Sequence, residues 1–330
     1  MTTILITAIA GDVAQASAQI VREQFPEWHI LGCDIHDRHG AALFVDDWYI
    51  APRANSSSYL SWFESFVKRK NVDICLPMSE AEIVAFAQAG VRKVARTNLI
   101  MPNAQAIAVG SDKLATARFL ASIGCPAPWT IPATNCNEKT PFPCIFKPRR
   151  GAGSKEIFVC ATIDDAKFFS DRYPDSILQE LLLPEDQEVT CAIYRTLDGR
   201  IAVLQLLRKL VDGSTAWAKV IDNPEIHNQC KHLALRLNLR GSINVQLRVT
   251  NQGPRIFEIN PRFSSTVRMR HLMGFHDLLW ALNEALGHKI ELYSPPEGIV
   301  GVRAQNACLL TANGDPMAPL SIKCTQKPEI

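Results

Sequence analysis

The sequence predicts an α/β protein in which an N-terminal domain with a parallel sheet precedes a larger region of mixed strands and helices. Strand and helix signals alternate over the first hundred residues, the pattern of a parallel sheet with helices on both faces. Strand signals then dominate the middle of the chain. At 330 residues the chain is too long for one simple core, so two or three subdomains are expected.

The N-terminal elements are predicted from short β-rich runs and from apolar residues at helical spacing. The first run enters a turn at Gly11-Asp12, and Val13, Ala16 and Ile20 then recur on one helical face. The expected strands are 3–8, 29–34 and 72–77, and the expected helices are 13–20, 59–70 and 81–89. This order predicts βαβ units and therefore a parallel sheet.

A capped helix is expected to open the second region. Asp112 stands in a Ser-Asp-Lys sequence before an apolar-periodic run, Gly124 fits the C-terminal cap, and Pro126 blocks continuation. Strands are then expected at 141–148, 176–183, 189–194, 200–207 and 299–310, and helices at 228–237 and 277–286.

Between these elements the sequence predicts a β-hairpin. Residues 243–249 alternate strictly between apolar and polar side chains, the pattern of a half-buried strand. Residues 255–260 can form the second strand, and residues 250–254 between them are rich in turn formers. A regular second strand would place Ile256 on the same face as Glu258.

The register of this hairpin can be estimated from its turn. If Val249 pairs with Arg255, then Gln246 falls opposite Glu258, and opposed Cβ atoms lie about 5 Å apart. Asn260 lies two residues further along the face of Glu258. The hairpin would thus gather three oxygen-donor side chains.

Those side chains suit a hard cation. Gln246, Glu258 and Asn260 offer the oxygen ligands that Mg²⁺ prefers, and Arg262 follows directly with a positive charge. Together they predict a metal site for work on phosphate groups. The alternative is a hairpin that presents an ordinary polar face to solvent, and the hairpin alone does not separate the two.

A second candidate feature is a lysine before a small-residue loop. Lys147 ends a predicted strand, and Gly151, Gly153 and Ser154 follow. Glycine allows backbone N–H groups to approach a phosphate, and lysine supplies a point charge. The loop lacks the Lys-Ser/Thr pair of a Walker A motif. Gly11 lacks the glycine fingerprint of a dinucleotide site, which we therefore reject there.

A third feature is the acidic segment 79–82, which follows a predicted strand. Ligands of α/β proteins bind at such strand ends, so this segment could contact a substrate. A helix N-terminus enriched in acids is the simpler interpretation.

Composition narrows the class of protein. The chain is 47% hydrophobic and 21% charged, and its net charge of +2 offers no support for a nucleic-acid partner. Its ten cysteines have no zinc-binding spacing and suit a reducing compartment. No apolar run has the length of a membrane span, and the N-terminus lacks the pattern of a signal peptide. We therefore expect a cytoplasmic protein without membrane or nucleic-acid partners.

Taken in order, these motifs resemble those of the ATP-grasp superfamily, and most closely the ATP-grasp units of carbamoyl-phosphate synthetase and its single-module relatives. The resemblance covers about residues 100–290. It depends on Ser111–Lys113 with Gly124–Pro126, on Lys147–Ser154, on Gln179–Leu182 with Glu188–Thr190, on Asn244–Gln246 and on Glu258–Arg262.

The resemblance implies a pre-ATP-grasp, Rossmann-like domain over residues 1–100 and a two-subdomain α+β ATP-grasp fold over 101–330. Within the latter it implies a lid subdomain at about 113–185, a metal-binding subdomain at about 186–295 and a C-terminal segment to 330.

The resemblance also implies roles for individual residues. Lys113 and Lys147 would bind phosphates, and the loop with Gly151, Gly153 and Ser154 would close over them. Glu180 and the backbone of Leu182 would hold adenine, and Glu188 the ribose. Gln246, Glu258 and Asn260 would hold two Mg²⁺ ions, with Mn²⁺ as an alternative. Lys147 and Arg262 would be catalytic, and Lys209 or its neighbour Arg208 would add a cation.

The activity that this resemblance implies is an ADP-forming ligase. ATP would phosphorylate a carboxylate substrate, and an amine would displace phosphate from the acyl phosphate to form an amide or peptide-like bond. Phosphorylation of bicarbonate or carbamate is one alternative, and a non-catalytic ATP-binding regulatory module is another. The implied partners are small-molecule carboxylates and amines, and a homodimer is left open.

Two positions depart from the family's pattern. Glu156 stands where relatives often carry glycine, and Cys191 stands where many carry aspartate. The first change would stiffen or recharge the lid. Neither removes a proposed metal ligand, so an active enzyme is still expected.

Overall fold

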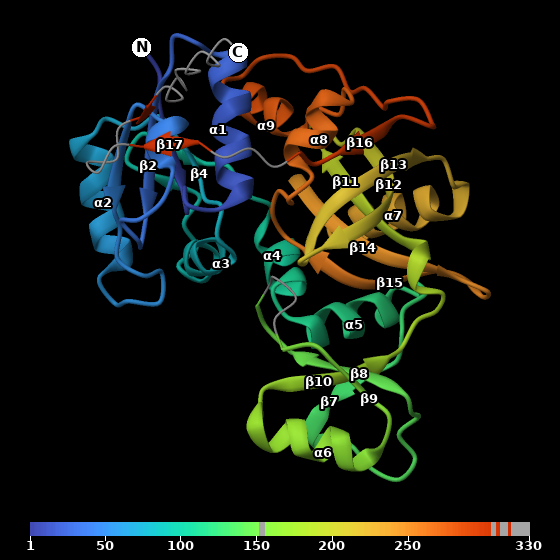
Figure 1. Cartoon of the computed structure of the whole chain (residues 1–330). Helices are drawn as coiled ribbons and strands as arrows, with labels where there is room; N and C mark the ends of the chain where they lie inside the picture. Colours follow the sequence, from blue (N-terminus) through green and yellow to red (C-terminus); the bar gives the residue numbers. More distant parts are fainter. Residues whose placement is uncertain (152–155, 305–307, 311–315, 318–330) are drawn as a thin grey trace, which may run out of the picture.

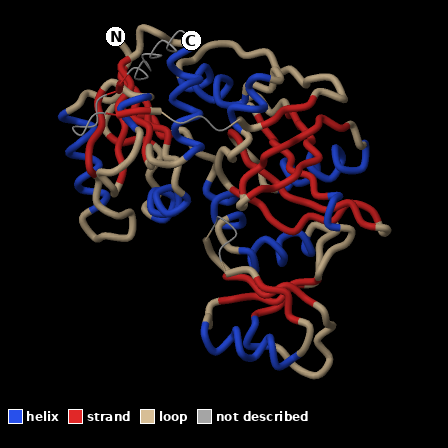
Figure 2. The backbone as a smooth tube through the Cα atoms, viewed as in Figure 1, coloured by secondary structure: helices blue, strands red, loops and turns tan. Residues whose placement is uncertain are grey.

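The computed structural model describes residues 1–151, 156–304, 308–310 and 316–317. The chain builds an N-terminal unit, a small sheet that projects from the rest of the molecule, and a large sheet (Figures 1 and 2). Gly153 and Ser154, two of the predicted phosphate-loop residues, lie outside the described residues.

The N-terminal unit contains a six-stranded sheet in the order β3-β2-β1-β4-β6-β5. All its neighbouring strands are parallel except β5 and β6. Its strands are β1 (Thr3–Thr7), β2 (His29–Asp34), β3 (Asp47–Ile50), β4 (Ile74–Leu76), β5 (Lys93–Val94) and β6 (Thr97–Leu99). Its helices are α1 (Asp12–Gln24), α2 (Tyr59–Arg69) and α3 (Glu80–Gln88), and η1 (Ala41–Leu43) is a short 3₁₀ turn.

Helices cover both faces of this sheet, as the alternating pattern predicted. Leu5, from β1, packs in one core with α2 and α3. Ile4 and Ile6, its neighbours in β1, pack in another core with α1. The parallel sheet is confirmed. The prediction missed β3, β5 and β6, because strands of two to four residues are too short to show a period.

The small sheet has four strands in the order β7-β10-β8-β9. They are β7 (Thr130–Pro132), β8 (Cys144–Pro148), β9 (Phe158–Cys160) and β10 (Ser176–Glu180), with η2 (Ala133–Asn135) and the helix α6 (Ile163–Arg172) beside them. Two helices connect this unit to the first sheet: α4 (Ala104–Gly110) and α5 (Lys113–Ser122). Asp112 caps α5 by accepting hydrogen bonds from the amides of Leu114 and Ala115, as its sequence position predicted.

The large sheet has six antiparallel strands in the order β15-β14-β11-β12-β13-β16. They are β11 (Glu188–Arg195), β12 (Ile201–Val211), β13 (Ser214–Ile221), β14 (Gly241–Thr250), β15 (Gly253–Asn260) and β16 (Val300–Val302), and η3 (Glu185–Gln187) precedes them. The associated helices are α7 (Pro224–Arg236), α8 (Val267–Leu272) and α9 (Asp277–Ala285).

The expected strand at 299–310 is wrong as a single element. β16 joins the large sheet, whereas β17 (Leu309–Leu310) pairs with β18 (Pro316–Met317) in a separate two-stranded sheet. The prediction also missed β13, whose side chains show no strict alternation.

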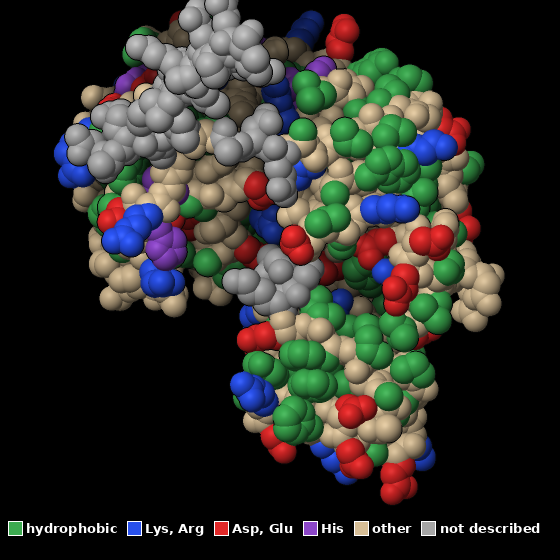
Figure 3. All heavy atoms as spheres, viewed as in Figure 1, with side chains coloured by type: hydrophobic (Ala, Val, Ile, Leu, Met, Phe, Trp, Pro, Cys, Tyr) green, Lys and Arg blue, Asp and Glu red, His purple; other side chains and the backbone are tan. Residues whose placement is uncertain are grey.

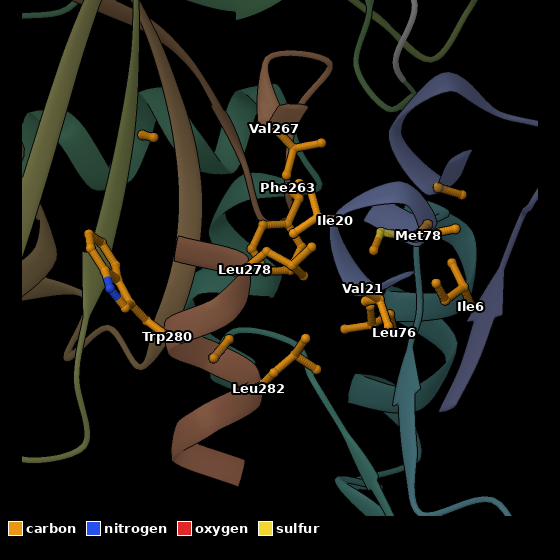
Figure 4. Close-up of a cluster of buried hydrophobic side chains, with 14 of the residues drawn as sticks. Ile6, Ile20, Val21, Leu76, Met78, Phe263, Val267, Leu278, Trp280 and Leu282 are labelled. Carbon is orange, nitrogen blue, oxygen red and sulfur yellow. The ribbon is translucent and has the colours of Figure 1, made fainter. Parts of the chain in front are cut away.

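The N-terminal unit and the large sheet share one apolar core, which holds the two units together. Val21 from α1 and Leu76 from β4 face Leu278 and Leu282 from α9 across this core (Figure 4). The helix α7 packs on the other face of the large sheet, against Val245 and its neighbours. The two sheets on either side of residue 100 therefore do not have fully separate cores. The domain boundary at about residue 100 stays a prediction. None of the described helices is both long and apolar enough to cross a membrane.

A buried ion pair anchors α8 and α9 to the start of β14. The guanidinium of Arg270 donates to both carboxylate oxygens of Asp277 at 2.8 and 2.7 Å, and the hydroxyl of Ser242 donates to the same carboxylate at 2.5 Å. Arg270 and Asp277 are 0% and 1% exposed. Removal of one charge would leave the other buried without its countercharge.

We predict that Asp277→Ala lowers the free energy of unfolding by about 3–5 kcal/mol, measured by chemical denaturation. The control is Asp37→Ala, which removes an exposed aspartate with no hydrogen bond among the described residues. The double variant Arg270→Met/Asp277→Leu should recover part of the loss, because no isolated charge remains. Equal stability of Asp277→Ala and wild type would contradict the buried pair.

Candidate active site

A cavity of about 400 Å³ lies where the small sheet, the large sheet and the N-terminal unit meet. Acidic and basic side chains gather beside one another in this part of the surface (Figure 3). Seven of the residues predicted from the sequence line the cavity: Lys113, Lys147, Gly151, Gln246, Glu258, Asn260 and Arg262. Residues separated by up to 149 positions in the sequence are thus brought to one place.

Lys147 stands at the end of β8 and is 4% exposed. Its Nζ atom lies 5.4 Å from the centre of the Phe257 ring, close enough for a cation–π contact. Burial lowers the pKa of Lys147 to about 8; Glu258 and Glu188 oppose this shift, whereas the charge of Lys113 adds to it. A desolvated ammonium of this kind gains from an anion placed beside it.

Lys113 begins α5 and ties that helix to the glycine loop. Its Nζ atom donates to the carbonyl of Gly151 at 2.8 Å. Gly151 has a φ of +103°, a backbone conformation that suits glycine. Arg149 reinforces the connection by donating to both carboxylate oxygens of Asp112 at 2.6–2.9 Å. These contacts connect the N-terminus of α5 to the loop at Gly151.

Gln246 and Glu258 are opposed across β14 and β15, as the sequence predicted, but the assumed register near the turn is wrong. Val249 pairs with Pro254 rather than with Arg255, and a β-bulge between Gln246 and Leu247 restores the predicted opposition. An extra residue in one strand shifts the alternation of its side chains.

The bulge also corrects the expected face of Ile256. Its side chain is 0% exposed in the core under α7, whereas Glu258 lines the cavity. Phe257, the extra residue, lies on the cavity side beside Lys147. The hairpin thus keeps an apolar core face and a polar cavity face on either side of the irregularity.

The donor set fits Mg²⁺ that is shared with phosphate. Glu258 contributes a carboxylate, and Gln246 and Asn260 contribute amide groups. Over the residues that the structure describes, no three His, Cys, Asp or Glu side chains come together as a metal cluster. With a single carboxylate, a cation here would need further oxygen ligands from a bound nucleotide. Mg²⁺ in proteins is usually bound in this way, by one or two carboxylates together with phosphate oxygens.

Asn244 belongs to the same polar face, and its environment favours an anionic ligand. It is 1% exposed, lines the cavity, and accepts a hydrogen bond from the hydroxyl of Thr190 at 2.9 Å. Its amide nitrogen is buried without a partner among the described residues. A buried donor without an acceptor is costly, and a phosphate oxygen in the cavity would supply one.

The additional cation predicted at position 208 or 209 is Arg208, which lines the cavity. Lys209 is exposed and does not line the cavity. Adjacent residues of a strand point to opposite faces. Leu204 and Leu206 share the face of Arg208 toward the N-terminal unit, and Val203 and Leu207 share the opposite face. This phase along β12 is a signal that could have selected Arg208 from the sequence.

Three predicted nucleotide contacts do not line the cavity: Glu180, Leu182 and Glu188. The carboxylate of Glu188 accepts from Arg208 at 2.6 Å and from Arg248 at 2.7 Å. Arg248 also donates to the Leu182 carbonyl at 2.7 Å, and Glu180 is paired with Arg255 at 2.6 Å. The carboxylates of Glu180 and Glu188 are therefore both paired with arginines. Contacts through Arg248 and Glu188 also connect Leu182 to Arg208 in the cavity wall.

Further residues at the cavity were not assigned a role from the sequence. Arg150 lines the cavity, as does Asp12 after β1. Glu80 lies in the field of the same site: burial raises its pKa, and the charges of Arg262 and Lys113 oppose the shift. The capping box of Ser79 and Glu82 confirms the helix N-terminus. The signal for Asp12 is its position after a parallel strand, the same signal from which a substrate contact was considered for segment 79–82.

The two departures from the family's pattern lie in different surroundings. Glu156 lines the cavity with a φ of +58°, a conformation that favours glycine. It therefore adds both backbone strain and a negative charge to the phosphate loop. Cys191 is buried on the opposite face of the large sheet, in the core with Cys230, so its substitution does not alter the cavity surface.

The fold of this chain is similar to the folds of a solved synthetase and a solved ligase. The described chain superposes on the N5-carboxyaminoimidazole synthetase of Staphylococcus aureus, solved with ADP, with a TM-score of 0.72 at 15% identity, over 90% of this chain and 80% of that one. It superposes on the L-amino acid ligase of Bacillus licheniformis with a TM-score of 0.67 at 12% identity, over 87% and 74% of the two chains.

Part of the sequence is similar to a more particular family. Residues 172–308 match the ATPgrasp_Ter family, described as an ATP-grasp in the biosynthetic pathway with Ter operon. The chain is also 26% identical over 156 residues to the carbamoyl-phosphate synthase of Methanobrevibacter smithii, which covers 45% of this chain. The match spans only 41% of that relative's length.

We predict that Lys147→Met raises the stability of the ligand-free protein at pH 7. The lowered pKa means that the folded state disfavours the charged lysine, by roughly 3 kcal/mol at most. Between pH 8 and the ordinary pKa of 10.5 the unfolded state binds more protons, so wild-type stability rises with pH and the advantage of the variant shrinks. Unfolding midpoints from pH 6 to 10 measure this change. Lys93→Met, at an exposed lysine, should show no such trend; a pH-independent advantage of Lys147→Met would contradict the lowered pKa.

Proposed function

We propose that this protein is an ATP-dependent, ADP-forming carboxylate–amine ligase. The observation that carries the proposal is the cavity in which Lys147, Arg208 and Arg262 face the oxygen donors Gln246 and Glu258. Phosphoryl transfer depends mainly on positioning and on neutralisation of charge, and this set of residues can provide both. The ATP-grasp fold and the known L-amino acid ligase with that fold support the proposal.

In the proposed reaction a carboxylate oxygen of the substrate attacks the γ-phosphorus of ATP, and ADP leaves. The amine then attacks the acyl carbon, phosphate leaves, and the nitrogen loses a proton as the amide bond forms. Lys147 and Arg208 would neutralise the phosphates, and Arg262 would stabilise charge on the transferred group. Gln246, Glu258 and Asn260 would hold Mg²⁺ or Mn²⁺, which supplies further charge neutralisation when bound.

The nucleotide-binding roles of the remaining residues are also proposals. Lys113 would reach a phosphate from α5, and the loop from Gly151 through Gly153 and Ser154 would cover it. Adenine would lie along the segment from Glu180 to Leu182. Glu188 would bind the ribose only by sharing its carboxylate with Arg208 and Arg248, which now hold it.

We further propose the domain division at about residue 100 and the lid at about 113–185. The projecting position of the small sheet supports a lid (Figure 1). We also propose small-molecule acids and amines as partners, without nucleic acid, and a cytoplasmic location; a homodimer is left open. Each of these proposals is separate from the chemistry of the cavity.

A second candidate is carbamoyl-phosphate-type chemistry, in which bicarbonate or carbamate accepts the phosphoryl group. The sequence similarity to a carbamoyl-phosphate synthase favours it. Its acceptors are much smaller than an organic acid, so an acceptor screen separates the two candidates.

We predict that Glu258→Ala lowers ADP formation at least ~100-fold, because it removes the one carboxylate among the proposed metal ligands. Wild type and variant should be compared by chromatography of nucleotide products over a panel of acids and amines. Glu185→Ala, at an exposed glutamate, is the control and should match wild type.

The nucleotide products decide the reaction type as well. Retained turnover in Glu258→Ala would contradict the metal assignment. Release of AMP and pyrophosphate by wild type would replace the acyl-phosphate scheme by adenylation. Binding of ATP without turnover on any acceptor would favour the non-catalytic module.

We predict opposite outcomes for two adjacent residues of β12. Arg208→Gln should lower kcat/KM for ATP by ~10–100-fold, since a hydrogen bond to a charged group contributes about 1.5–3 kcal/mol. Lys209→Gln removes a charge next in sequence but outside the cavity, and its kcat/KM should stay near the wild-type value. Steady-state kinetics with varied ATP measure both, and equal effects would contradict the assigned face of β12.

A further inference from the structure

A second cavity, of about 190 Å³, adjoins the proposed active site. Arg262 lines both cavities. The walls of the second one come from the ends of β4 and β6, the start of β14, and α9. The carboxyl ends of parallel strands are a common place for ligands in α/β sheets.

The charged groups of this cavity are mainly positive. Arg92, Arg240 and Arg262 face one acid, Glu284. Both oxygens of Glu284 are already occupied, because one accepts from the Tyr194 hydroxyl at 2.6 Å and the other from the Leu197 amide at 2.9 Å. Glu284 is therefore held by the protein, and the three arginines dominate the field that a ligand would meet.

Arg92 and Arg240 form a pair of positive charges at this cavity. Arg92 is positioned by hydrogen bonds to the carbonyls of Met101 and Pro102, both at 2.7 Å. Burial lowers the pKa of Arg92, and the charge of Arg240 lowers it further. The amide of Arg240 is held by Asn103 at 3.1 Å, but its guanidinium has no hydrogen bond or ion pair among the described residues. Two guanidinium groups without a carboxylate between them favour a bound anion.

We propose that the carboxylate substrate, which accepts the phosphoryl group, is a small molecule with a second acidic group. This second group is a carboxylate or a phosphate ester, and Arg92 and Arg240 bind it. The proposal rests on the ligase function proposed above. The acid that receives the phosphoryl group would lie at Arg262, where the two cavities adjoin. Apolar side chains such as Leu99 and Phe263 would contact the carbon chain between the acidic groups.

The arrangement selects for length and charge together. A ligand with one acidic group could satisfy either Arg262 or the pair, whereas a ligand with two could satisfy both at once. Guanidinium groups suit carboxylates and phosphates equally through paired N–H donors. The volume of about 190 Å³ limits the occupant to a small molecule.

The test compares acids that differ by one acidic group: pentanoate with glutarate, alanine with aspartate, and glycolate with phosphoglycolate. Binding of each acid to the full chain is measured by calorimetry with ADP and Mg²⁺ present, and ADP release from ATP is measured with an amine panel. We expect a doubly acidic member to bind at least ~10-fold more tightly than its partner, since it makes an additional charge-assisted contact. A preference for glutarate or aspartate would identify the second group as a carboxylate, and a preference for phosphoglycolate would identify it as a phosphate ester.

Arg240→Gln is the informative variant, because it removes the guanidinium without altering the backbone contact to Asn103. It should reduce the preference for the doubly acidic ligand ~10–100-fold, through KM rather than kcat, while ADP affinity stays unchanged. Arg236→Gln, at an exposed arginine of α7 outside both cavities, should keep the full preference.

The outcomes separate this proposal from the ligase function. If singly acidic members support ADP release as well as doubly acidic ones, or if Arg240→Gln keeps the preference, the second binding group is wrong and the ligase stands. If a doubly acidic member binds with the expected dependence on Arg240 but never promotes ADP release, the binding group stands and the ligase function is wrong. If no member binds, the proposed binding group is wrong.

Discussion

The β-bulge in the β14–β15 hairpin is the constraint on which the candidate site depends. A regular antiparallel pair that continued the register found at the turn would move Glu258 out of opposition to Gln246. One extra residue changes the phase, so that Ile256 lies in the core under α7 while Glu258 lines the cavity. Irregularities of this kind re-aim side chains beside functional sites. The hairpin thus combines a packed apolar face with a polar face that lines the cavity.

A layer of arginine–carboxylate contacts supports the cavity from behind. Glu188 holds Arg208 and Arg248 at once, which fixes one cation in the cavity wall and connects it to the segment at Leu182. A carboxylate that is shared in this way can change partners when a ligand hydroxyl or phosphate arrives. The contacts of Glu188 and Arg248 therefore connect the cavity wall to Leu182, in the segment between the small and the large sheet.

Sequence reasoning predicted the parts of the molecule where side-chain periodicity is strong. The alternation in residues 243–249 gave the cavity face of β14, and the βα pattern gave the parallel sheet. It left Lys209 and Arg208 as alternatives because the phase of β12 was not followed along the strand. The arginine partners of Glu180 and Glu188 could not be predicted, because Arg255 and Arg248 reach them only through the tertiary fold. The bulge was also missed, since the residues around Phe257 carry no turn signal.

The balance of charge shows why the site and its neighbouring cavity belong together. Lys113, Lys147, Arg150, Arg208 and Arg262 line the first cavity, and the second adds Arg92 and Arg240. Acidic groups within the first cavity offset part of this charge, and the pKa of Lys147 is still lowered by its burial. Like charges held together in a partly desolvated space repel one another, and an anionic ligand relieves that repulsion. A polyphosphate would relieve it in the first cavity, and an acidic acceptor would do so in the second. Since Arg262 lines both cavities, its charge acts on a ligand in either one.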